Sequence, residues 1–125
     1  MPETIRTGGC LCGKLRYEVR GEPFKGGLCH CADCRKITGS SFLHYADWRP
    51  DQFTYSGPFE TYAGRSFCPR CGSHTFNLGE DQVEIHLGTL DDAPTEIKPE
   101  VEGWCIRREP WLQAIPGMPM YPEDP

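Results

Sequence analysis

The stretch Cys68-Pro69-Arg70-Cys71-Gly72 (CPRCG) is a metal knuckle. Two cysteines three positions apart in a tight turn can reach one ion, and the chain after such a turn commonly needs a positive φ, which costs glycine least. Zinc prefers four ligands in a tetrahedron, so the knuckle needs two more. Cys10 and Cys12 supply a matching pair, because side chains at i and i+2 of an extended segment face the same way. The sequence therefore predicts one closed, structural zinc site.

A second cluster, Cys29-His30-Cys31-Ala32-Asp33-Cys34, holds three thiols within six residues. Three thiols this close can bind one ion from a single loop, and the neighbouring sequence offers no fourth cysteine. Zinc sites with three protein ligands and an open position are the catalytic type. The cluster therefore predicts a zinc whose exchangeable fourth position suits the capture of a small thiol. The alternative is a second closed site completed by Cys105 or by a histidine.

Residues beside this cluster have two interpretations each. Arg35 and Lys36 could offset the negative charge of a three-thiolate zinc centre and hold a substrate carboxylate, or could form a solvated helix face, which is favoured for Lys36. Side chains alternate in direction along an extended segment, so His30 should point away from the metal. There it either contacts the substrate or a metal ligand, or, as we favour, it packs as an ordinary histidine. Cys105 is most simply a buried apolar cysteine.

Composition limits the classes of function. The 125 residues suit one domain, residues 1–125, and the net charge of -5 argues against nucleic-acid binding. No apolar run reaches the ~18 residues of a membrane span, and no secretory signal is visible at the N-terminus. We therefore expect a cytoplasmic protein, where eight clustered cysteines favour metal binding over disulfides. A redox CxxC would need a thioredoxin-type strand–helix unit, which is not evident.

The pattern of apolar residues predicts a mostly β chain with one or two short helices. Lys14–Val19 alternates between apolar and polar residues, as a half-buried strand does. A short helix is expected at 32–37, closed near Gly39. Further strands are expected at 42–48, 53–55, 59–67 (interrupted by Gly64), 76–78, 83–87 and 104–106, and an irregular tail is expected from about 116.

With these motifs, the chain resembles the family of glutathione-dependent formaldehyde-activating enzymes, which also includes centromere protein V. The resemblance covers residues 9–121. It depends on the two cysteine motifs described above, on Gly9-Cys10-Leu11-Cys12-Gly13, and on later matches at 88–92, 110–111 and 117–119. One departure is Val101-Glu102-Gly103, where many members carry a histidine.

The resemblance implies an Mss4-like fold, a β-tent of mainly antiparallel strands stabilised by zinc. It implies a structural zinc at Cys10, Cys12, Cys68 and Cys71, and a second, labile zinc at Cys29, Cys31 and Cys34. The implied activity is that of a carbon–sulfur lyase: the addition of glutathione to formaldehyde, or its reverse. We therefore expect an enzyme with Cys29, Cys31, Cys34 and Arg35 as catalytic residues and a small thiol and a small aldehyde as partners. A non-catalytic zinc-stabilised binding module is the alternative, because fold does not fix function.

Overall fold

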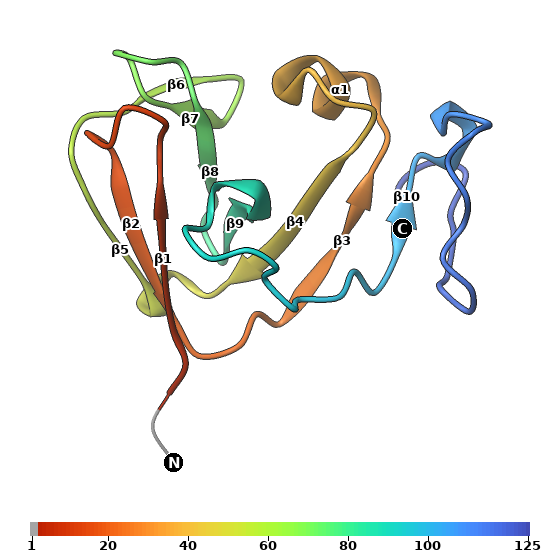
Figure 1. Ribbon diagram of the computed structural model, residues 1–125, viewed down its shortest axis with the longest axis horizontal. Coiled ribbons are helices and arrows are strands. Elements are labelled where there is room, and N and C mark those ends of the chain that lie inside the picture. Colours follow the sequence, from red (N-terminus) through yellow and green to blue (C-terminus); the bar gives the residue numbers. More distant parts are fainter. Residues whose placement is uncertain (1–2) are drawn as a thin grey trace.

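The computed structural model describes residues 3–125, which form two β-sheets (Figure 1). The smaller sheet is antiparallel, with the strand order β1-β2-β5, and consists of β1 (Ile5–Gly9), β2 (Arg16–Arg20) and β5 (Phe53–Ser56). The larger sheet has the order β10-β3-β4-β9-β8-β7-β6, and only its β10–β3 pair is parallel. This architecture confirms the mostly β class. The strands of the larger sheet are β3 (Lys25–Cys29), β4 (Leu43–Trp48), β6 (Glu60–Tyr62), β7 (Arg65–Phe67), β8 (His74–Leu78), β9 (Val83–His86) and β10 (Glu102–Gly103).

The helix α1 (Ala32–Thr38) confirms the predicted short helix. It begins after Cys31, whose Sγ accepts a hydrogen bond from the Cys34 backbone N–H, and it ends at Gly39, which has a left-handed φ of 66°. Within residues 3–125, no helix has the length and apolar character needed to span a lipid bilayer. Short 3-10 turns complete the regular structure at η1 (Pro50–Gln52), η2 (Leu87–Thr89) and η3 (Cys105–Arg107).

The hydrophobic core lies between the two sheets. The apolar positions of the alternating stretch predicted at Lys14–Val19 all turn inward, and Leu15 and Val19 are fully buried. They belong to the same buried cluster as Trp48 and Ile85 of the larger sheet. Cysteines of the predicted closed site also belong to this cluster, so the metal knuckle is part of the core.

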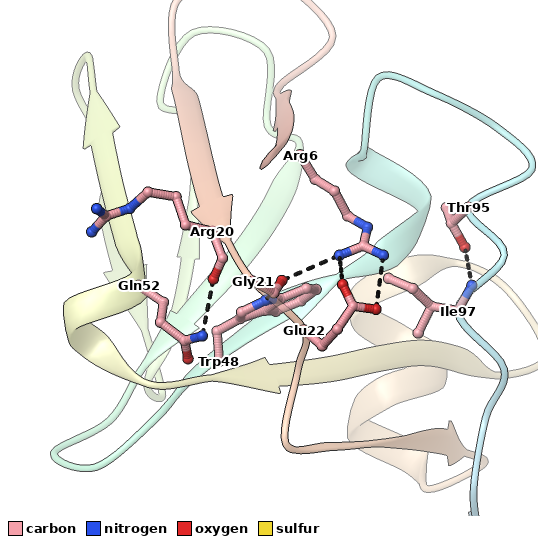
Figure 2. A network of polar contacts seen from close by, with 8 residues as sticks. All are labelled: Arg6, Arg20, Gly21, Glu22, Trp48, Gln52, Thr95 and Ile97. Carbon is pink, nitrogen blue, oxygen red and sulfur yellow. Dashed lines mark hydrogen bonds and ion pairs between the residues drawn. The ribbon is translucent and has the colours of Figure 1, made fainter. Parts of the chain in front are cut away.

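A polar network at one corner links the two sheets (Figure 2). The indole N–H of Trp48 on β4 donates to the carbonyl of Gly21, at a distance of 3.0 Å, just after β2. Arg6 on β1 donates to the same carbonyl and to both carboxylate oxygens of Glu22. Gln52 donates to the carbonyl of Arg20. Because Trp48 is fully buried, this network satisfies its indole N–H while its ring fills the core.

Two strand predictions need correction. The expected strand at 59–67 is a hairpin of β6 and β7, because Ala63 (φ 50°) and Gly64 (φ 79°) form a two-residue turn with positive φ at both positions. The expected strand at 104–106 is wrong, because Trp104 has a left-handed φ of 57° and η3 follows it. The strand at this place is β10, two residues earlier.

The segment that contains β10 lies along β3, the strand that leads into the second cysteine cluster (Figure 1). Gly27 permits this approach, since a Cβ there would lie 2.5 Å from the carbonyl oxygen of Val101. The last residues then run beside β10: the Glu102 backbone N–H donates to Pro119, and the Trp104 N–H donates to Glu123. The C-terminal quarter of the chain therefore lies beside that cluster.

Candidate metal centres and the adjoining cleft

The four cysteines of the predicted closed site converge from two loops. Cys10 and Cys12 lie in the turn between β1 and β2, rather than in the extended segment that the sequence suggested, and the Gly13 N–H donates to the Cys10 carbonyl. Cys68 and Cys71 follow β7. Gly72 has a φ of 80°, as expected after the knuckle. All four sulfurs lie within 4.8 Å of one another.

The sulfur geometry fits a zinc ion. The Sγ atoms of Cys10 and Cys12 are 3.5 Å apart, and those of Cys12 and Cys68 are 3.7 Å apart. A regular tetrahedron of sulfurs around zinc, with bonds of ~2.3 Å, has edges of ~3.8 Å. Cys68 is fully buried and Cys10 nearly so, whereas Cys12 and Cys71 are partly exposed. Because four sulfurs leave no open position around zinc, this set suits a structural ion rather than an exchangeable one.

The second cluster brings Cys29, Cys31 and Cys34 within 4.8 Å of one another at the junction of β3 and α1. Among the described residues, no further cysteine, histidine or carboxylate joins either group of ligands. A hydrogen bond from Cys34 lowers the pKa of the Cys29 thiol to about 6, and the same contact raises the pKa of Cys34. These three soft donors could hold a zinc ion, as the sequence predicted for this cluster.

His30, between two of these cysteines, is fully buried on the side away from them. Its Nε2 lies 2.9 Å from Oε1 of Glu102, which is also fully buried. The same carboxylate oxygen accepts a hydrogen bond from Nε of Arg108, and the His30 backbone N–H donates to Gly103. His30 therefore does more than pack, because its contacts join the cysteine loop to β10 and, through Glu102, to Arg108.

The cationic residues after the cluster differ in their surroundings. Arg35 donates to Oε1 of Glu109 at 2.7 Å and to the carbonyl of Arg107 at 3.1 Å, so its guanidinium links α1 to the C-terminal segment. Lys36 is exposed, as a solvated helix face requires. Cys105 is only partly buried, so its expected burial is wrong, and its sulfur contacts the Glu102 carbonyl rather than a metal group.

A cleft of about 410 Å³ adjoins the three thiols, large enough for a small peptide-like molecule or part of one. Side chains from five strands line it together with Trp104 and the last two residues of the chain. Its charged and phenolic members, which the sequence did not single out, are Lys25, Tyr45, Asp47, Arg65, Glu84 and Asp124. Alternation along 42–48 and 83–87 places some of them on one sheet face, but it does not show that the cysteine cluster lies over that face.

The remaining histidines are not among the residues that line this cleft. His44, His74 and His86 line a separate cleft between the end of α1 and the metal knuckle. Burial lowers the pKa of His86 to about 4, which keeps this imidazole neutral. Since none of the three joins a group of metal ligands, the sequence alternative in which a histidine completes the second site finds no support among the described residues.

Comparisons with known proteins agree with this architecture. A family model described as "Glutathione-dependent formaldehyde-activating enzyme" matches residues 5–107, a range that contains all eight cysteines. The crystal structure of a Rhodobacter sphaeroides protein has a TM-score of 0.55 and 19% identity, over 71% of this chain and 91% of that chain. At this identity, the similarity supports the fold alone. No curated protein matches the sequence.

Proposed function

Because the chain belongs to the family of glutathione-dependent formaldehyde-activating enzymes, we propose that it forms or breaks a carbon–sulfur bond between a small thiol and a small aldehyde. Glutathione and formaldehyde are the pair that the family suggests, with S-hydroxymethylglutathione as the adduct. The observation that carries the proposal is the set of three thiols, Cys29, Cys31 and Cys34, which gather within 4.8 Å and line a cleft.

The two cysteine groups fit two zinc ions of different kinds. Cys10, Cys12, Cys68 and Cys71 would hold a structural ion, and the three-thiol group would hold a second ion that can exchange. When bound there, zinc would supply an open position and favour the thiolate form of an incoming thiol. The fit depends on the donor set, which for both groups is all sulfur.

The side chains of the cleft can bind and orient the thiol. Glutathione carries two carboxylates, and Lys25 and Arg65 bring cations to the lining. The sequence predicts this role for Arg35 as well. Arg35 is not among the residues that line the cleft, and two N–H groups of its guanidinium are engaged by Glu109 and Arg107, so we propose it only as a secondary contact through its remaining donors.

The proposal includes a reducing, cytoplasmic compartment. All eight cysteines are free thiols in the structure, although seven of them lie in two tight clusters. In an oxidising compartment, thiols this close would form disulfides and lose their capacity to bind metal.

The substitution Cys31→Ser tests the enzyme proposal. The Cys31 sulfur caps α1, and serine is a preferred residue at this position, so the helix should keep its N-terminus. We expect thiol-dependent turnover to fall to background while the circular dichroism spectrum stays the same. Cys105→Ser, which changes the cysteine outside both clusters, is the matched control and should keep full turnover. Unchanged turnover in Cys31→Ser would end the proposal.

Cobalt substitution separates an enzyme from a non-catalytic zinc-stabilised module. In the enzyme, added glutathione should alter the visible spectrum of Co(II) bound to the three-thiol group, because the open position takes up the new sulfur. In a module with two closed sites, both Co(II) ions would show four-sulfur spectra that do not respond to thiol.

A further inference from the structure

Four polar residues form a row across the sheet on the floor of the cysteine-lined cleft. Lys25 of β3 is paired with Asp47 of β4, and Asp47 is paired with Glu84 of β9. Glu84 is in turn paired with Asn77 of β8. All four line the cleft that Cys29, Cys31 and Cys34 also line. The row therefore places two carboxyl groups side by side in the space where the thiol would react.

The surroundings of the two carboxyl groups differ. Asp47 is 1% exposed, and its Oδ1 has no hydrogen-bond partner among the described residues. Glu84 is partly exposed, with 24% of its side chain accessible, and its Oε1 accepts a hydrogen bond of 3.0 Å from Nδ2 of Asn77. Glu84 is therefore the more accessible carboxyl group of the two, and Asp47 is almost fully buried beside it.

Burial favours the protonated form of both carboxyl groups. Residues directly opposite on antiparallel strands have Cβ atoms about 4.5–5.5 Å apart. At this separation the charge of Asp47 also disfavours the ionised form of Glu84. Burial and the neighbouring Asp47 raise the pKa of Glu84 to about 7, and burial raises the pKa of Asp47 to about 6.

Other charged and titratable groups face this pair. The cation of Lys25 lowers the pKa of Asp47, and the cation of Arg65 lowers that of Glu84, each by less than burial raises it. His86 Nε2 lies 3.9 Å from Oε1 of Glu84, and Tyr45 and Cys29 lie on the same side of the sheet. Within residues 3–125, no hydrogen bond joins either carboxyl group to a cysteine.

We propose that Glu84 is the acid–base group of the carbon–sulfur reaction and that Asp47 positions its proton. This inference rests on the proposed function. The carboxylate takes the S–H proton of the thiol, and a sulfur electron pair then forms the C–S bond to the carbonyl carbon. The π pair of the C=O bond moves to oxygen, which receives the proton back from the carboxyl group. The thiol proton thus ends on the new hydroxyl group, and Glu84 returns to its starting state.

The test compares Glu84→Gln, Asp47→Asn and Glu80→Gln, a control on an exposed glutamate in the neighbouring β8–β9 turn. Positioned acid–base groups contribute about 10²–10⁴-fold to rate, so we expect Glu84→Gln to lower kcat by at least about 10²-fold. Its KM for glutathione should stay within about twofold of the native value. Asp47→Asn should keep most of kcat near neutral pH but shift the pH–rate profile toward lower pH. Zinc content should match the native protein in all three variants.

The outcomes separate this inference from the function on which it rests. No thiol-dependent turnover in the native protein would overturn the proposed function. Turnover in the native protein together with native kcat in Glu84→Gln would overturn this inference alone. If the variants do not fold, carbon-13 NMR of labelled carboxyl groups in the native protein decides. Coupled titration of Glu84 and Asp47 between about pH 5 and 8 supports the pair, and independent titration below about pH 4.5 refutes it.

Discussion

His30 and Glu102 are 72 residues apart in the chain, but their side chains form a hydrogen bond of 2.9 Å and neither residue is exposed. Arg108 donates to the same carboxylate oxygen, so one buried carboxylate contacts both an imidazole and a guanidinium group. This contact determines how the cysteine loop is oriented, because His30 lies between Cys29 and Cys31.

The substitution Glu102→Ala should destabilise the protein by about 3–5 kcal/mol, because it leaves the fully buried His30 and the partly buried Arg108 without their partner. Urea unfolding measures the loss. Glu100→Ala changes an exposed glutamate two residues away and should alter stability by less than about 0.5 kcal/mol. Equal effects of the two substitutions would show that the buried contact contributes nothing specific.

Removal of the closed site should unfold the chain. Structural zinc contributes on the order of 10–16 kcal/mol of apparent binding free energy in small zinc peptides, whereas whole domains are stable by only ~5–15 kcal/mol. We therefore expect Cys68→Ser to lose one zinc per chain and its cooperative thermal transition. Cys105→Ser should keep both the metal content and the transition. A cooperative melt of Cys68→Ser at the native temperature would contradict the prediction.

The pH dependence of stability should report on Glu84. Its pKa in the folded state, about 7, is above the ordinary value of 4.5, so the folded protein binds more protons between these values. Stability from this group is therefore present at low pH and is lost as the pH rises from about 4.5 to 7. Relative to the native protein, Glu84→Gln should gain up to about 3 kcal/mol in unfolding free energy between pH 5 and pH 8. A constant difference would show that Glu84 titrates normally.

The cations of the cleft should determine affinity for the thiol. A charge-assisted hydrogen bond to a carboxylate is worth about 1.5–3 kcal/mol, so Arg65→Gln should raise the KM for glutathione by roughly 10–100-fold. Arg35→Gln should raise KM less, because its guanidinium is bound to Glu109. Steady-state kinetics with glutathione and with cysteamine, which has no carboxylate, isolate the effect of the carboxylate contact, because only the KM for glutathione should rise. A larger effect at Arg35 would assign it the principal role.

The two groups of cysteines could be predicted from the sequence because they depend on short spacings between neighbouring residues. The spacings of Cys68 with Cys71, and of Cys29, Cys31 and Cys34, identify ligands before any tertiary contact is known. Cys10 and Cys12 do lie beside the two cysteines of the knuckle, although a turn rather than a strand brings them together.

The cleft could not be predicted, because its residues come from distant strands. Alternation shows that Asp47 and Glu84 each lie on one face of a strand, but only the pairing of β4 with β9 brings them together. The contact between Glu102 and His30 depends on a parallel strand of two residues, too short to leave a pattern. Trp104 adopts a left-handed conformation that its sequence gives no reason to expect.

The pairing of β10 with β3 makes the support of the second cysteine cluster depend on residues that are synthesised long after it. All ligands of the closed site have been translated once Cys71 has been added. His30 gains its buried partner only when Glu102 has left the ribosome. Cys29, Cys31 and Cys34 are therefore present early in translation, but their loop gains the contact that holds it in place only late.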